Sequence, residues 1–145
     1  MNDVGLAARW RSWAPYLMSV LRVIAAFLFM QFGTAKLLAF PAAILPGGGT
    51  APAGSLVWFA SVLETFGGGL VLMGLFTRPV AFILSGEMAF AYFIGHAPHG
   101  FWTVLNQGAP AVVYCFLFLY FSAAGAGPWS LDALIAGRRM RPGQP

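Results

Sequence analysis

Charged residues are scarce in this sequence. Of its 145 residues, 8% are charged and 59% are hydrophobic, whereas a typical soluble domain has about 25% charged residues. So few charges cannot cover a surface that faces water, which excludes an ordinary soluble domain. The composition therefore indicates an integral membrane protein.

Cysteine is almost absent, since Cys115 is the single one and lies in an apolar run. One thiol cannot form an internal disulfide, a CxxC redox pair or a cluster of metal-binding thiolates. The sequence also contains no nucleotide-binding fingerprint. We therefore expect no covalently bound cofactor, no metal site and no catalysis by this chain alone.

Long apolar runs dominate the rest of the sequence. Four of them come close to the roughly 20 residues that a membrane-spanning helix needs. They predict spans at residues 16–40, 55–76, 79–97 and 109–125. We predict a single all-α membrane domain, residues 1–145, built as an antiparallel bundle of four transmembrane helices.

Basic residues give the chain a net charge of +4. Such a charge indicates nucleic-acid binding when the bases form one patch, but here most of them flank the apolar runs, so we predict no nucleic-acid partner. By the positive-inside rule, these flanking bases predict that both termini and the turn after the second span are cytoplasmic. The bases in question are Arg9, Arg11, Arg78, Arg138, Arg139 and Arg141.

Four charged residues lie within the predicted spans, namely Arg22, Lys36, Glu64 and Glu87. A charge at the centre of a bilayer costs about 3 kcal/mol on insertion scales, so each needs compensation. At 100° per residue, each shares a helix face with small residues, which allow helices to approach closely. We expect these faces to point inward, including the face that Glu87 shares with Ile83, Ala91 and Ile94.

Two arrangements would compensate these charges. Arg22 could pair with Glu87 and Lys36 with Glu64, which would remove most of the cost of burying either member. Alternatively, the two bases could extend to the membrane interface and leave the acids protonated. In the first case the ion pairs would fix the register of the helices.

Polar and aromatic residues near the span ends offer weaker candidate sites. His96 and His99 could bind a metal, haem or quinone oxygen, but Pro98 between them disfavours a shared helical face. Tyr114, Tyr92 and Tyr120 could line a ligand cleft, although an aromatic face in this chain is usually core or lipid contact.

The last segment, residues 129–141, predicts an amphipathic interfacial helix. Ser130 is a suitable N-cap, Asp132 lies in the first turn and arginines lie at the end. The simplest use of such a helix is attachment to anionic lipid.

Taken together, several segments resemble the DoxX family of small bacterial membrane proteins, in an ordered set that covers roughly residues 17–135. The resemblance implies a multi-pass protein of the bacterial inner membrane, linked to quinone-dependent redox systems. It also implies a quinone ligand, with other redox-complex subunits or further copies of the chain as partners. The matching segments are Leu21-Arg22, Gly33-Thr34-Ala35-Lys36-Leu37, Leu63-Glu64 with Gly67-Gly68-Gly69, Gly74-Leu75-Phe76-Thr77-Arg78-Pro79, Gly86-Glu87-Met88-Ala89-Phe90-Ala91-Tyr92-Phe93, His96-Ala97-Pro98 and Gly127-Pro128-Trp129-Ser130-Leu131-Asp132.

The chain departs from this family pattern in two places. Gln31-Phe32 stands where relatives commonly have Glu-His, and Asn106-Gln107-Gly108-Ala109 stands where they often have Gly-Gly-Glu before the fourth helix. Two carboxylates and a histidine are thus missing. Gln31 and Asn106 join His96 and His99 as weaker candidate residues, and an architectural role gains weight.

The sequence therefore predicts an accessory membrane subunit of a quinone-linked respiratory or redox complex, either non-catalytic or in contact with quinone. Arg22, Lys36, Glu64 and Glu87 are its candidate polar interior. One alternative is a structural subunit that packs against a larger membrane complex. Another is a small transporter in which Glu64 and Glu87 couple proton movement to a solute.

Overall fold

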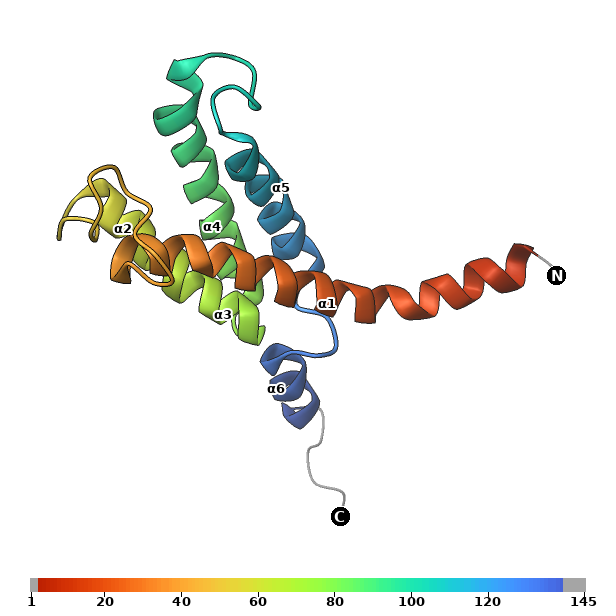
Figure 1. Ribbon diagram of the computed structural model, residues 1–145. Helices are drawn as coiled ribbons and strands as arrows, with labels where there is room; N and C mark the ends of the chain where they lie inside the picture. Colours follow the sequence, from red (N-terminus) through yellow and green to blue (C-terminus); the bar gives the residue numbers. More distant parts are fainter. Residues whose placement is uncertain (1–2, 140–145) are drawn as a thin grey trace.

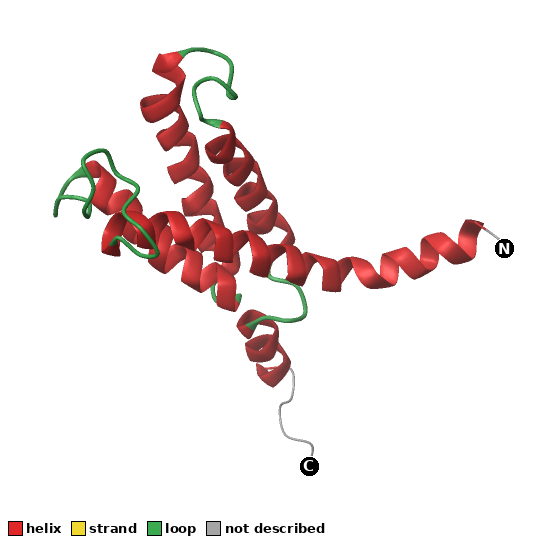
Figure 2. Cartoon of the chain, viewed as in Figure 1, coloured by secondary structure: helices red, strands yellow, loops and turns green. Residues whose placement is uncertain are grey.

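The computed structural model describes residues 3–139, and all regular elements in that range are helical. Figure 2 shows the helices joined by loops, without strands in the described part of the chain. The predicted all-α class is confirmed.

The first helix, α1, runs from Asp3 to Leu38. It begins well before the predicted span at residue 16, and its first turns extend away from the other helices (Figure 1). Pro15 lies inside this helix. The apolar part, Arg9–Leu38, is long enough to cross a membrane.

The second apolar segment is a continuous helix over Leu56–Met73. It consists of α2 (Leu56–Val62), a π-helical turn, η1 (Leu63–Gly67), and α3 (Gly68–Met73). Ser55 caps its start, because the Ser55 side chain accepts a hydrogen bond from the backbone N–H of Trp58 at 3.1 Å. Gly74 ends it in the left-handed conformation, with φ 68°.

The third segment, Thr77–His99, combines α4 (Thr77–Ala91), the π-helical η2 (Tyr92–His96) and the 3-10 turn η3 (Ala97–His99). It is followed by α5 (Ala109–Ala124) and α6 (Leu131–Arg139). With 16 residues, α5 is shorter than the other apolar segments.

The long helices form two pairs. α1 packs against α2, η1 and α3, and α4 packs along α5. In Figure 1 the two pairs cross each other instead of running parallel. The core lies where they meet, and there the Phe29 ring of α1 contacts the Phe118 ring of α5 with centroids 4.7 Å apart.

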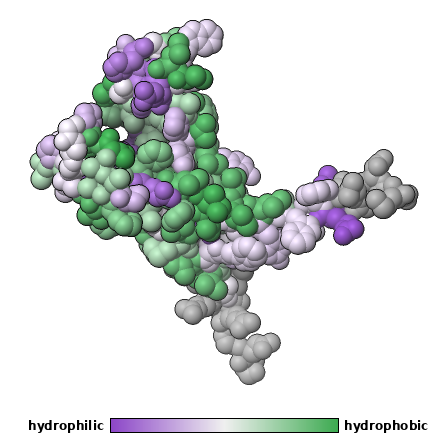
Figure 3. Space-filling view, in the orientation of Figure 1, coloured by the Kyte–Doolittle hydropathy of each residue, from purple (hydrophilic) through white to green (hydrophobic). Residues whose placement is uncertain are grey.

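The outer surface is largely apolar. Figure 3 shows hydrophobic residues over the middle of the molecule and hydrophilic ones toward its ends. Trp10, Trp13, Trp102 and Trp129 are exposed, as side chains of an interfacial aromatic belt would be. Among residues 3–139, three helices are long and apolar enough to span a membrane, so a bilayer is the environment of this chain. The four-span bundle and the cytoplasmic side of the termini stay predictions.

The predicted inward faces are correct for two helices, and on the third helix they are correct for Glu87 and Ala91 but wrong for Ile83 and Ile94. On α1, Arg22, Ala26 and Phe29 are buried, and on the second segment Glu64 is buried. On the third, Ile83 and Ile94 are 54% and 50% exposed. The most buried residues of α4 are Thr77, Ala81, Leu84, Ser85 and Met88, because this helix packs chiefly along α5.

Candidate functional site

Lys36 and Glu64 form an ion pair inside the protein. Lys36 Nζ lies 2.6 Å from Glu64 Oε1 and 2.5 Å from Oε2. The two side chains are 18% and 5% exposed. The predicted contact between these residues is confirmed, and the alternative in which Lys36 extends away from the acid is not adopted.

Gly33 allows this pair to form. A Cβ atom at Gly33 would lie 2.8 Å from Glu64 Cβ and 2.6 Å from the backbone nitrogen of Thr65. Only glycine therefore lets α1 approach η1 this closely. Lys36 follows one turn later on α1, which brings its ammonium group to the Glu64 carboxylate.

Glu64 lies within the π-helical turn η1. Such a turn holds one residue more than an α-helical turn and shifts the direction of the side chains that follow it; π-turns occur frequently at functional sites. Glu64 and Gly68 are both buried against α1. The turn thus places the carboxylate and the close-packing glycine on the same contact surface.

Glu87 lies beside this ion pair but takes no part in it. It lies on α4, which contacts η1, the turn that carries Glu64. Both of its carboxyl oxygens are buried, and neither has a hydrogen-bond partner among residues 3–139. The cluster therefore contains two acids and one base, and Glu87 is the member whose charge is uncompensated.

Arg22 binds backbone carbonyls instead of Glu87. Its side chain is 1% exposed. Its Nε donates to Ala126 O at 2.8 Å, Nη1 donates to Val71 O and Leu72 O, both at 2.5 Å, and Nη2 donates to Trp129 O at 2.5 Å. The predicted Arg22–Glu87 pair is wrong, as is the alternative in which Arg22 extends to the interface.

Arg22 binds backbone carbonyls because the end of α3 offers carbonyls without partners. The last carbonyls of a helix have no partner within it and accept hydrogen bonds readily. The fork of five guanidinium N–H donors fits several such carbonyls at once. Arg22 thus joins α1 to the end of α3 and to the chain after α5.

Asp132 caps α4 from a distance in the sequence. Its Oδ1 accepts from the backbone N–H of Phe76 at 2.8 Å, and its Oδ2 accepts from that of Thr77 at 2.9 Å. The Asp132 N–H donates to Gly74 O at 2.8 Å. Sequence reasoning placed Asp132 in the first turn of its own helix, which is correct, but missed this contact.

The predicted tail helix is present as α6. Ser130 caps it, since Ser130 Oγ accepts from the Ala133 N–H at 3.1 Å. Arg141 and the end of the predicted range 129–141 lie outside the described residues. Attachment of this helix to anionic lipid stays a prediction.

The weaker candidates His96 and Asn106 organise the loop after α4. His96 Nδ1 lies 2.9 Å from the backbone oxygen of Asn106. The Asn106 amide donates to Gly100 O at 2.7 Å and its Oδ1 accepts from the Gly108 N–H at 2.8 Å. His99 is exposed, and among residues 3–139 no three His, Cys, Asp or Glu side chains lie together as a metal site.

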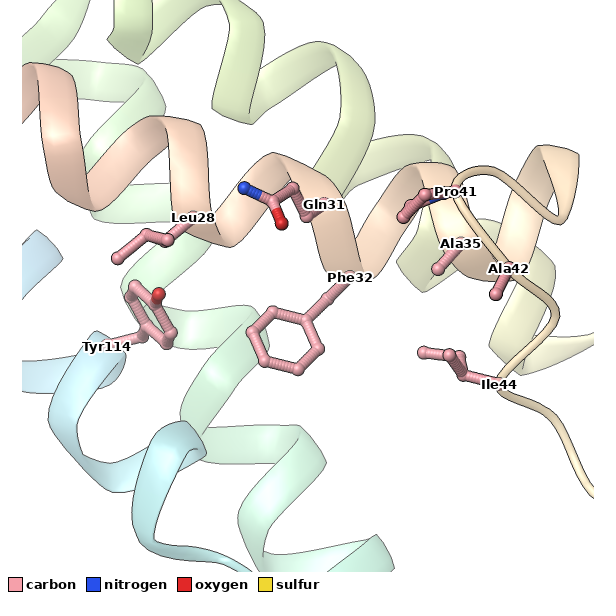
Figure 4. Close-up of a pocket in the computed structure, with 8 residues that line it drawn as sticks. All are labelled: Leu28, Gln31, Phe32, Ala35, Pro41, Ala42, Ile44 and Tyr114. Atoms are coloured by element: carbon pink, nitrogen blue, oxygen red, sulfur yellow. The ribbon is translucent and has the colours of Figure 1, made fainter.

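The remaining candidate, Gln31, lines a groove of about 370 Å³ between α1, α5 and the loop after α1. Figure 4 shows its lining side chains, with the Tyr114 hydroxyl directed toward α1. Sequence reasoning assigned Tyr114 to core or lipid contact, because nothing in the pattern indicated which side of α5 faces α1. The lining residues are Leu28, Gln31, Phe32, Ala35, Pro41, Ala42, Ile44 and Tyr114.

Comparison with known proteins gives a family and a related bacterial sequence. The DoxX family model matches residues 17–97. An uncharacterized protein of Haemophilus influenzae is 46% identical over 121 residues, which cover 81% of this chain and 90% of that protein. No solved structure matches the chain.

Proposed function

The chain belongs to the DoxX family, and from this premise we propose that it is an accessory membrane subunit of a quinone-linked redox complex of the bacterial inner membrane. In this proposal, partner subunits carry the electrons, and this chain supplies a protonatable group within the membrane. The chain is not catalytic by itself.

The observation that carries the proposal is the uncompensated acid Glu87. Its two buried oxygens lack partners among the described residues, and an ionised carboxylate without partners is costly in an apolar medium. The neighbouring Lys36–Glu64 pair already uses the one base of the cluster. A carboxyl group so placed is suited to take up and release a proton.

Quinone chemistry requires such a group. Oxidation of a quinol to a quinone releases two electrons and two protons, and the protons need an acceptor at the depth of the ring. Intramembrane acids commonly serve in proton relays. Glu87, as a carboxylate, would accept one of the two protons and pass it to water, and a group of the electron-carrying partner subunit would accept the other. The Lys36–Glu64 pair would stay charged throughout.

Purification of the native protein in mild detergent tests this proposal. We expect cofactor-bearing partners to copurify and either to reduce added quinone or to oxidise added quinol. Glu87→Gln should lower that turnover about tenfold without dissociating the complex, whereas the volume-conserving control Met88→Leu should leave it unchanged. Absence of redox partners would overturn the function, and full turnover of Glu87→Gln would overturn the role of Glu87.

A structural subunit is the second candidate, and the Arg22 contacts favour it. Arg22 donates hydrogen bonds to four backbone carbonyls, two in α3 and two in the chain after α5. This buried charge therefore holds α1 to both segments. The exposed apolar surface offers area for a larger complex. A partner complex that lacks quinone and tolerates Glu87→Gln would support this candidate.

A further inference from the structure

A pocket separate from the groove at Gln31 lies at the end of the protein where α4 begins. It is formed by the start of α4, the chain after α5 and the first turn of α6, and its volume is about 420 Å³. We propose that this pocket binds the headgroup of one phosphatidylethanolamine molecule, with Arg78 holding the phosphate and Asp132 holding the ammonium group. The inference does not depend on a redox role for the chain.

The pocket lies at the level where the apolar helices end. Thr77 and Arg78 are the first residues of α4, and Gly125 follows the last residue of α5. Trp129 is 60% exposed and directly precedes Ser130, which lines the pocket. Exposed tryptophans of membrane proteins gather at the level of the lipid headgroups. The pocket is therefore at the depth where a phospholipid headgroup lies.

Arg78 brings a positive charge to the pocket. Its side chain is exposed, and its guanidinium donates to the backbone oxygens of Ser122, Ala123 and Ala124 at the end of α5. A Cβ at Gly125, which also lines the pocket, would lie 3.3 Å from Arg78 Nη2. The guanidinium is thus held at the pocket lining. Its five N–H donors allow it to bind two phosphate oxygens in addition to these carbonyls.

Asp132 brings the opposite charge from α6. Its Oδ1 accepts from the Phe76 N–H at 2.8 Å and its Oδ2 from the Thr77 N–H at 2.9 Å. Each carboxylate oxygen has two acceptor sites, so each can accept a further N–H. Thr77 also lines the pocket, is fully buried, and has a hydroxyl oxygen without a hydrogen-bond partner among residues 3–139. These acceptors suit an ammonium group, which has three N–H donors.

The charges of the lining select the headgroup. Among the described residues that line the pocket, one is an arginine and one is an aspartate, which matches a headgroup with one phosphate and one ammonium group. Phosphatidylglycerol has no cation for Asp132. Phosphatidylcholine carries the same charges as phosphatidylethanolamine, but its ammonium group has no N–H to donate. Phosphatidylethanolamine is the one of these three lipids that gives both side chains charge-assisted hydrogen bonds.

Apolar side chains beside the pocket offer a surface for the acyl chains. Phe82 follows Arg78 by one turn of α4 and therefore lies on the same face. Because α5 packs along α4 (Figure 1) and Arg78 bonds to Ala123 O, Leu119 lies at the level of Phe82, one turn before Ala123. Phe82 and Leu119 are 64% and 43% exposed. An acyl chain can thus run from the pocket along both helices.

Native mass spectrometry of the delipidated chain in detergent, titrated with dihexanoyl phospholipids, tests the inference. The dissociation constant for phosphatidylethanolamine should be about tenfold lower than for phosphatidylcholine or phosphatidylglycerol, the effect of one charge-assisted hydrogen bond. Asp132→Asn should remove this preference, and Arg78→Gln should weaken binding of all three lipids. Ala133→Trp keeps both charges and should abolish binding by filling the pocket. The matched control Arg9→Gln, at an exposed arginine outside the pocket, should bind as the wild type does.

Three outcomes would overturn the inference. Equal affinity for phosphatidylethanolamine and phosphatidylcholine, or unchanged affinity in Ala133→Trp, would show that the lipid does not bind in this pocket as described. Tighter binding of phosphatidylglycerol would show an anion site in which Asp132 has no role. Glycerophosphoethanolamine carries the same headgroup without acyl chains and should compete poorly, whereas displacement of the lipid at equal concentration would identify a soluble phosphoethanolamine as the ligand.

Discussion

The four charged residues in the apolar helices differ in how the cost of their burial is compensated. Arg22 is saturated by backbone carbonyls, Lys36 and Glu64 neutralise each other, and Glu87 has neither kind of compensation among the described residues. The first two solutions are structural. Glu87 is the functional candidate because its buried carboxyl group has no compensating partner among the described residues.

Replacement of Arg22 by lysine should destabilise the protein by at least about 2 kcal/mol. A lysine ammonium is a point donor with three N–H groups and cannot reach all the carbonyls that lie around the edge of the planar guanidinium. Some of the carbonyls of Val71, Leu72, Ala126 and Trp129 would then be left unpaired. Unfolding by SDS in mixed micelles would measure the loss, with the exposed Arg9→Lys as control.

Loss of Lys36 should destabilise the protein more than loss of the whole ion pair. Lys36→Met leaves the buried Glu64 carboxylate unpaired, at a cost of about 3 kcal/mol. In the double variant with Glu64→Gln, no charge remains unpaired and most of that stability should return. A double-mutant cycle on unfolding free energies would measure the coupling. Simple additivity of the two changes would contradict a stabilising pair.

At the scale of elements, the contact between α1 and η1 depends on the absence of a side chain. The nearest atoms to a Cβ at Gly33 belong to Thr65 and Glu64, and two of them belong to the backbone or to Cβ, which cannot rotate away. The π-helical turn and the glycine are therefore parts of one packing arrangement.

Gly33→Ala should force α1 and η1 apart and lower the unfolding free energy by about 1–3 kcal/mol, the usual cost of overpacking. Gly86→Ala is the matched control, because a Cβ there meets nothing within 4 Å and alanine favours the helix. Thermal unfolding in detergent would compare them. Equal stability of the two variants would show that α1 and η1 do not pack as described.

The sequence predicted the helices and two ion pairs, of which the structure contains Lys36–Glu64 and not Arg22–Glu87. Helical periodicity gives the direction of a side chain, and the small-residue faces of α1 and of the second segment led to the Lys36–Glu64 contact. Periodicity does not identify which neighbour a face meets, so Arg22 was assigned to the wrong partner. Backbone carbonyls carry no sequence signal, and a contact such as Asp132 with the start of α4 joins residues 55 positions apart.

The groove was missed for a similar reason. Gln31 was noticed only as a departure from the family pattern, and Tyr114 was one of several aromatic residues on α5. Only the placement of α5 against α1 brings the two together with the loop residues Pro41, Ala42 and Ile44. Such a site depends on how helix pairs cross, which hydrophobic periodicity does not encode.

At the scale of the whole molecule, the number of membrane crossings depends on α5. Three helices meet the length of a span, while α5 has 16 residues, about 24 Å of helix. A bilayer can thin locally to accept a short helix. The side on which α6 lies follows from whether α5 crosses.

Cysteine labelling would settle the crossings. In a Cys115→Ala background, we expect Ala53→Cys to react with a membrane-impermeant maleimide in intact cells and Ala136→Cys to react only after lysis. Three crossings separate these positions if α5 spans the membrane. Labelling of both from the same side would mean that α5 does not cross.

The hydrogen bonds of Arg22 join segments of the chain that are translated at different times. Arg22 is translated 104 residues before its partner Ala126, which at bacterial rates of roughly 5–20 residues per second is a delay of about 5 to 20 seconds. During that interval the first helix enters the membrane with a guanidinium that still needs water or lipid phosphate around it. A nascent chain that has not yet reached Ala126 therefore leaves this arginine without two of its four carbonyl partners, those of Ala126 and Trp129.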